Sequence, residues 1–230
     1  CMFQQLLWLP QSTELPPVSP YDFSFASALA SFFSDRHVLC RDPSYYYRSF
    51  SSPPLTLFLP DCSGTIQTTY KILSLLLDYP NEDVKENLSG LKRVIEEENG
   101  LDKAQSNLLS QFLDPIQSIT LSDWQMLYVQ QFDFSSSTNL YLFDHVYGDS
   151  RERGQAMVDL TEMYNKAGFM PCSDELPDYL PLFLEYLSLL KNEEESLKLL
   201  KEVSHILENM RKALQKKETP YSYLLELLCS

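Results

Sequence analysis

The chain has 230 residues and a formal net charge of −14, because 18 lysines and arginines stand against 32 aspartates and glutamates. A surface this acidic repels phosphate backbones and anionic membranes, which argues against nucleic-acid binding and membrane attachment and favours a basic partner. No apolar run approaches the roughly 18–20 residues that span a bilayer, no secretory signal is present, and the scattered cysteines lack CxxC spacing, so we expect a cytoplasmic protein.

The composition changes near residue 65. Residues 1–65 hold eight of the fourteen prolines, eleven serines and twelve aromatic residues, but no lysine. Prolines so frequent would interrupt any regular element. Our hypothesis is that this irregular segment is not part of the native folded protein but upstream sequence, read through from a non-methionine start near Thr65–Thr69. The alternative is a genuine, poorly ordered extension.

Residues 66–230 show apolar residues at helical spacing in one segment after another. The first predicted helix covers about 67–78 and ends at Pro80. Asn81 caps the second helix, and Asn99-Gly100 ends it. A third predicted helix stops before Pro115, and a fourth begins at a capping box formed by Ser122 and Gln125. We expect these helices to bury one stripe each, formed by Tyr70, Leu73, Leu77, Val84, Leu88, Leu91, Ile95, Leu101, Ala104, Leu108, Phe112, Trp124, Tyr128 and Phe132.

The second half of this region predicts four more helices. They span Asp149 to about Lys166, a segment that begins near Pro177, about 192–214, and a segment that begins at Thr219-Pro220. No alternating strand pattern competes with them. We therefore predict an all-α fold, with a single helical bundle domain of about eight helices over 66–230 and the irregular segment before it.

Catalytic patterns are weak in this chain. It has no glycine-rich phosphate loop, no GxSxG elbow and no HExxH motif. Asp144, His145 and Asp149 are poor candidates for a metal site, because three mixed ligands in a loop are a weak signal. An enzyme that uses Glu175 or His145 would need a deep pocket and a shifted pKa, which nothing in the sequence demands. We predict a protein that is not an enzyme, with no catalytic residue, no metal and no stably bound cofactor.

Several dense motifs resemble those of one family. They are Tyr128 with Phe132–Phe134, the stretch from Leu142 to Gly154, the stretch from Glu175 to Pro181, and the Tyr70–Pro80 segment that ends in Leu-Leu-x-Tyr-Pro. The chain is similar in these residues to the respiratory nitrate reductase assembly chaperones, the delta subunit or NarJ family. That family belongs to the all-helical maturation chaperones of molybdenum enzymes. The likeness covers about residues 68–228.

The resemblance implies a function. Members bind the N-terminal segment of the catalytic (alpha) subunit of a membrane-bound nitrate reductase, and they hold it while molybdopterin guanine dinucleotide is inserted. They assist assembly of the enzyme without being part of the final complex or inserting into the membrane. The client segment is basic and prone to form an amphipathic helix, which suits an acidic bundle with an apolar groove. The alternative is a chaperone of the same fold for another molybdenum oxidoreductase, such as one that acts on dimethyl sulfoxide, trimethylamine oxide or selenate.

The groove is expected around residues 140–154 and 175–186. Aromatic and apolar side chains would supply contact area, and carboxylates would receive basic side chains. The alternative for three of the apolar residues is that they belong to the hydrophobic core; these are Phe132, Leu142 and Phe143. The predicted client-binding residues are Tyr128, Phe132, Leu142, Phe143, Asp144, His145, Asp149, Arg151, Arg153, Glu175, Pro177, Asp178, Tyr179 and Glu185. We expect Arg151 and Arg153 to bind neighbouring carboxylates, and Pro177 to shape the start of a helix.

Overall fold

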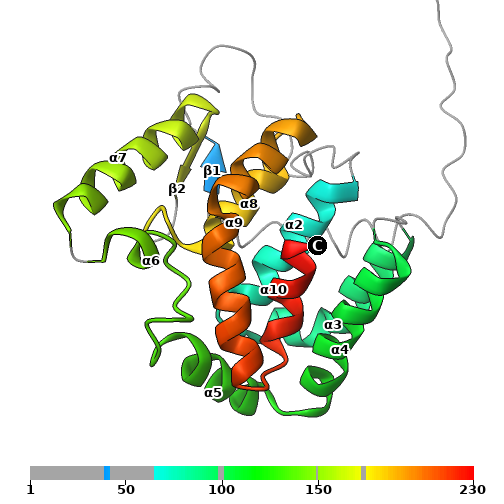
Figure 1. Ribbon diagram of the computed structural model, residues 1–230. Helices are drawn as coiled ribbons and strands as arrows, with labels where there is room; N and C mark the ends of the chain where they lie inside the picture. The colour runs from blue at the N-terminus through cyan, green and yellow to red at the C-terminus, as the bar shows by residue number, and fades with distance from the viewer. Residues whose placement is uncertain (1–38, 42–64, 98–100, 149, 172–174) are drawn as a thin grey trace, which may run out of the picture.

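A computed structural model describes residues 39–41, 65–97, 101–148, 150–171 and 175–230, and over these residues it has nine helices and one short sheet (Figure 1). In chain order the elements are β1 (Leu39–Arg41), α2 (Thr65–Leu77), α3 (Glu82–Glu97), α4 (Lys103–Ser118), α5 (Leu121–Phe132), α6 (Asp144–Tyr147), α7 (Arg151–Lys166), β2 (Phe169–Pro171), α8 (Leu180–Leu189), α9 (Glu193–Lys216) and α10 (Tyr221–Cys229). The predicted all-α class is confirmed.

Three short elements were not predicted: α6, β1 and β2. Helix α6 is a single turn of four residues, too short to show a periodic pattern. Strand β2 pairs antiparallel with β1, so that Cys40 lies opposite Met170. The expectation that residues 66–230 contain no strand is therefore wrong at β2, because a three-residue strand gives no visible alternation.

The hypothesis about residues 1–65 lies almost entirely outside the described residues. The structure describes only Leu39–Arg41 and Thr65 of that segment. The origin of the segment and the domain boundary near residue 65 therefore stay predictions.

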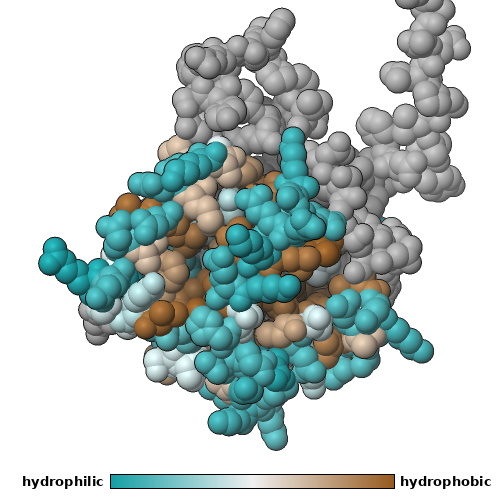
Figure 2. Space-filling model, turned by 45° about the horizontal axis from the view of Figure 1, so that its top comes forward, coloured by the Kyte–Doolittle hydropathy of each residue, from teal (hydrophilic) through white to brown (hydrophobic). Residues whose placement is uncertain are grey.

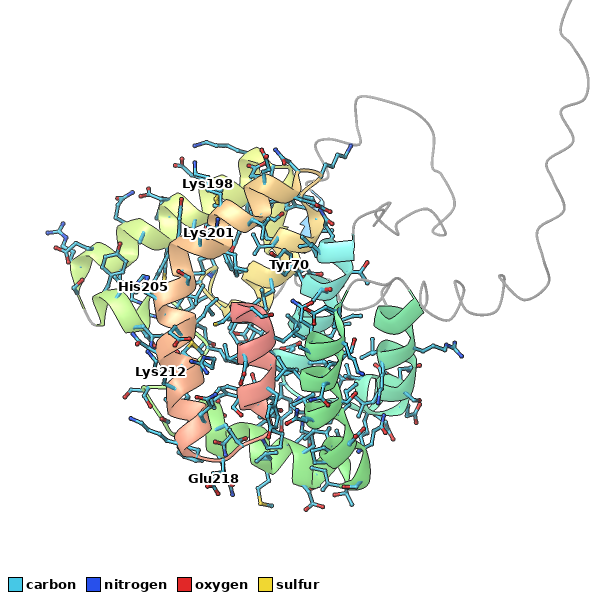
Figure 3. The ribbon with its side chains drawn as sticks, turned by 45° about the vertical axis from the view of Figure 1, so that its right-hand side comes forward. Tyr70, Lys198, Lys201, His205, Lys212 and Glu218 are labelled. Carbon is cyan, nitrogen blue, oxygen red and sulfur yellow. The ribbon has the colours of Figure 1, made fainter. Side chains whose placement is uncertain are left out.

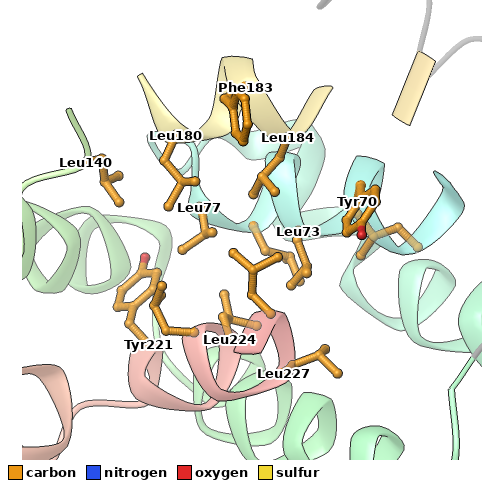
Figure 4. Packing of buried hydrophobic residues seen from close by; sticks show 14 of the residues in the cluster. Tyr70, Leu73, Leu77, Leu140, Leu180, Phe183, Leu184, Tyr221, Leu224 and Leu227 are labelled. Atoms are coloured by element: carbon orange, nitrogen blue, oxygen red, sulfur yellow. The ribbon is translucent and has the colours of Figure 1, made fainter. Parts of the chain in front are cut away.

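The core is built around helix α8. Residues from Leu180 through Ser188 are all buried, so this helix lies inside the bundle and not on its surface. Helix α2 packs along it, and α10 packs against α9 and α4. Figure 4 shows the leucines of α2, α8 and α10 converging on one another, with Leu140 and Tyr221 at the edge of the cluster. Burial of this apolar surface is the main force that holds the helices together.

Helix starts follow local capping chemistry. The predicted cap Asn81 is confirmed, since its side-chain oxygen accepts the N–H of Val84 at 3.0 Å. Helix α5 begins earlier than predicted, with Thr120 and not Ser122 as its N-cap. The Thr120 hydroxyl accepts the N–H of Asp123 at 3.2 Å. Gln125 therefore takes no part in a capping box, and its side chain donates to the carbonyl of Pro80 at 2.8 Å.

Helix α4 continues through Pro115, where we predicted that it would stop. The proline lies in the last turn, where its missing N–H removes one hydrogen bond within the helix. Two effects offset that loss. Ile116 is fully buried, and Lys85 of α3 donates to the carbonyls of Ile116 and Gln117 at the helix end.

Helix α7 lies at one side of the bundle, close to α6 and β2 (Figure 1). It begins at Arg151, and the predicted start at Asp149 lies outside the described residues. Tyr164 is its one buried residue. Gly168 follows the helix end with a φ of 84°, which favours glycine.

Helix α9 carries exposed basic side chains on its outer face. Lys198, Lys201, His205 and Lys212 follow one another along it (Figure 3). In the part of the chain that the structure describes, no helix is both long enough and apolar enough to cross a bilayer.

Candidate functional site

The loop before α6 is fastened to the start of α8. The main-chain N–H of Leu142 donates to the carbonyl of Asp178 at 3.0 Å, and the N–H of Leu180 donates to the carbonyl of Leu140 at 2.8 Å. A bridge between Tyr141 and Tyr179 lies between these bonds. The two motifs that the sequence singled out, around 140–154 and 175–181, are therefore in direct contact.

Asp178 is the centre of this contact. It is fully buried, and its Oδ2 accepts the N–H of Phe143 at 3.0 Å. The guanidinium of Arg153 lies 3.8 Å from the same oxygen and also pairs with Asp144. Burial raises the pKa of Asp178, and the Phe143 N–H and the Arg153 charge only partly oppose that rise. The predicted role of Arg153 in binding neighbouring carboxylates is confirmed, whereas Arg151 is exposed.

The hydrogen bonds of Asp178 and Arg153 are incomplete. Oδ1 of Asp178 and Nε of Arg153 are buried, and neither has a hydrogen-bond partner among the described residues. Buried polar atoms are usually bonded, so these two atoms are exceptions, as are single side-chain atoms of Gln67, Thr68, Gln131 and Thr219.

His145 has a structural role in this geometry. Its Nε2 lies 2.8 Å from the carbonyl of Asn139, so this nitrogen carries the proton and donates it. The amide of Asn139 in turn donates to Asp144. Among the described residues, no group of three or more histidine, cysteine or acidic side chains could hold a metal ion, and Asp149 lies outside them.

Two predicted site residues form the buried edge of the site with Asp78. The hydroxyls of Tyr128 and Tyr179 lie 2.9 Å apart, and Tyr179 also donates to Asp78 at 3.1 Å. Burial raises the pKa of both tyrosines, so both are neutral donors and acceptors. Phe132 packs against Tyr128 with ring centroids 4.9 Å apart. Phe132 and Leu142 are core residues, 3% and 1% exposed, as their alternative interpretation had it.

The remaining predicted residues divide between surface and interior. Glu175 is exposed, and its Oε2 accepts the hydroxyl of Tyr141 at 2.8 Å. Pro177 accepts the hydroxyl of Tyr164 at its carbonyl, 2.9 Å away. Glu185 is fully buried and pairs with Lys71 of α2. It faces that helix, and the structure does not bring it to the loop.

Sequence reasoning missed the exposed residues that border this contact. Val146 and Tyr147 of α6 are 49% and 36% exposed, and Leu176 is 41% exposed. Tyr79, before α3, is 48% exposed. All four lie inside the quoted motifs, but a motif gives no separate signal of which of its apolar residues are exposed.

Comparison with known proteins gives one consistent result. Residues 81–225 match the family described as nitrate reductase delta subunit. The nitrate reductase molybdenum cofactor assembly chaperone NarJ of Escherichia coli (strain K12) is 39% identical over 157 residues, which cover 68% of this chain and 66% of the relative. A NarJ of Bacillus subtilis (strain 168) is 35% identical over 162 residues, which cover 70% of this chain and 86% of that protein.

A solved structure shares the fold. It is a crystal structure from Archaeoglobus fulgidus, described as that of a candidate redox enzyme maturation protein. Its TM-score is 0.52 at 19% identity, and the match covers 79% of this chain and 95% of that one. The sequence match with NarJ of E. coli spans just under two thirds of the length of that relative.

Proposed function

The chain belongs to the nitrate reductase delta subunit family, and from this we propose that it is an assembly chaperone for a nitrate reductase. It binds the N-terminal segment of the catalytic subunit and holds that subunit while molybdopterin guanine dinucleotide is inserted. It then leaves the finished enzyme. The observation that carries the proposal is the family match, together with relatives whose names describe chaperones and not catalysts.

The surface supports a client that is basic and amphipathic. The net charge of −14 attracts a basic segment, and exposed apolar side chains offer it contact area. Figure 2 shows apolar surface on both sides of a central hydrophilic area. Such apolar surface fits the apolar face of an amphipathic helix.

We place the client at the contact between the α6 loop and the start of α8. The exposed residues there are Val146, Tyr147 and Leu176 with Glu175, and they are the groups that touch the client. The buried members of the predicted set, led by Asp178, fix the shape of the loop and do not themselves meet solvent. Glu185 stabilises the packing of α8 on α2.

Calorimetry of the full chain tests this function. The ligand is a peptide of the first fifteen or so residues of the catalytic subunit encoded beside this chain, and a scrambled peptide is the control. We expect saturable binding with a Kd in the micromolar range or tighter. Absence of binding to a chain with intact helical circular dichroism would refute the proposed function.

A matched pair of leucines tests the place of the site. Leu176 is 41% exposed at the proposed surface, and Leu197 is 39% exposed on α9. Leu176→Ser should weaken binding about fivefold, because the apolar surface that the client still covers there is worth about 1 kcal/mol. Leu197→Ser should leave the Kd unchanged. An equal effect of both substitutions would move the client to another surface.

A further inference from the structure

Arg153 stands between two carboxylates and is bonded to one of them. Its Nη1 pairs with Oδ1 of Asp144, whereas its Nη2 lies 3.8 Å from Oδ2 of Asp178. Hydrogen bonds between a guanidinium and a carboxylate are usually about 2.7–2.9 Å long. In this structure Arg153 is therefore held by Asp144 and only lies near Asp178.

The second pair has two atoms without a partner. Nε of Arg153, a donor, and Oδ1 of Asp178, an acceptor, are buried and have no hydrogen-bond partner among the described residues. A guanidinium can bind a carboxylate through two parallel bonds, so a shift of Arg153 by about 1 Å would join these atoms in such a fork. Oδ2 of Asp178 can take part, because it accepts one N–H, that of Phe143, and has a second lone pair.

That shift would release Asp144, which a ligand in solvent can reach. The Asp144 side chain is 29% exposed, and it belongs to α6, whose Val146 and Tyr147 are exposed at the proposed client surface. Among the described residues, its carboxylate is bonded by Arg153 and by the neutral amide of Asn139. Arg153 is therefore the cation that a ligand would have to replace there.

The arrangement allows one cation to replace another without leaving a buried charge alone. A cation that binds Asp144 repels Arg153, and Arg153 then completes its bonds at Asp178, so that both of their charges stay paired. We propose that Asp144 binds a basic side chain of the client's N-terminal segment by exchange, in which Arg153 moves from Asp144 to Asp178. This inference rests on the proposed function, because it assigns the carboxylate that receives the basic face of the client.

Calorimetry of the full chain tests the exchange. The probes are the fifteen-residue client peptide and versions in which each arginine or lysine is replaced in turn by methionine. Asp144→Asn should weaken binding of the natural peptide about two- to fivefold, the range expected for a partly exposed ion pair. It should have no effect on the peptide that lacks the one cation bound there. Asp159→Asn is the matched control, because it removes the same charge from the exposed face of α7, and its effect should depend on no single basic residue of the peptide.

Asp178→Asn separates exchange from a simple ion pair. The side-chain oxygen of asparagine still accepts the N–H of Phe143, but the neutral amide no longer attracts Arg153. Arg153 should then stay on Asp144, and this buried substitution should weaken binding with the same dependence on one basic residue. If Asp144→Asn weakens all peptides equally, or weakens none, Asp144 binds no client cation. If Asp178→Asn leaves binding unchanged, Arg153 does not exchange. The proposed function stands in both cases.

A second measurement needs no client. The Nε–H of Arg153 gives its own NMR signal, and a bond to a carboxylate shifts that signal downfield and slows its exchange with water. Asp144→Asn removes the present partner, so Arg153 should form the fork with Asp178 and show both effects relative to the unchanged chain. Asp178→Asn should show neither. Absence of both effects in Asp144→Asn overturns the exchange. Their presence supports it even if the peptide does not bind, a result that refutes the proposed function alone.

Discussion

Replacement of Arg153 by methionine tests the central contact of the site. Methionine keeps most of the aliphatic stem and removes the guanidinium that lies 3.8 Å from Asp178. Asp178 is fully buried and would lose its one cation, although the Phe143 N–H would remain. An ionised carboxylate left alone in the interior is strongly destabilising.

The magnitude follows from the distance. At an effective dielectric constant near 20, two unit charges about 4 Å apart attract by about 4 kcal/mol. Arg153 is 22% exposed, so solvent screens part of this attraction. We therefore expect Arg153→Met to lower the free energy of unfolding by about 2 kcal/mol at pH 7, which lowers Tm by about 4–8 °C for a chain of this size.

Urea unfolding followed by circular dichroism measures this effect. At pH 7 the loss should be largest, and near pH 4 it should shrink, because protonation removes the charge that Arg153 balances. Asp178→Asn in the Arg153→Met background should recover most of the loss. A loss below about 0.5 kcal/mol at pH 7, or an equal loss with asparagine at position 178, would refute the reasoning.

Three further outcomes follow from single positions. Gly148→Ala should lower the free energy of unfolding by about 1–2 kcal/mol, because Gly148 has a φ of 51° that strains any other residue. Gly90→Ala inside α3 should raise it by about 0.5 kcal/mol. Urea unfolding measures both changes. Phe112→Ala should lower the free energy of unfolding by about 3–5 kcal/mol in the same assay, since Phe112 is fully buried. Leu108→Ala should lower it less, because Leu108 is half-buried. Burial raises the pKa of Asp178, so its contribution to stability is full below pH 3.8 and is lost as the pH rises through the folded pKa; Asp178→Asn should therefore cost more at pH 3.5 than at pH 7.

Local patterns predicted most of the helical framework. Helical spacing identified buried residues such as Leu73, Phe112 and Trp124, because one face of each helix must lie against the core. The start of α9 was predicted at about residue 192, and in the structure Asn192 caps it by accepting the N–H of Glu194 at 3.0 Å. Prediction failed where tertiary contacts decide. The continuation of α4 through Pro115 depends on bonds from a lysine in another helix.

The site was predicted as a set of residues but not as an arrangement. The sequence marked Asp178 and Glu185 as acidic groups for a client, because local spacing says nothing about burial of a charge. Their partners, Arg153 and Lys71, lie 25 and 114 positions away along the chain. Contacts between distant segments decide which carboxylates are internal, and a single sequence does not show them. Tyr79 was missed for the same reason.

The carboxylates of this chain therefore have two roles, one in the interior and one at the surface. Asp178 and Glu185 are fully buried and face a cation of the chain itself, so each fixes one segment to another. The exposed carboxylates outnumber the exposed cations, which leaves the surface acidic with a net charge of −14. Surface charge is screened by salt, whereas a buried pair is screened much less. Salt should therefore weaken the encounter with a basic client long before it loosens the loop that shapes the site. Under the proposed function, salt would therefore release a charged client without unfolding the surface that holds it.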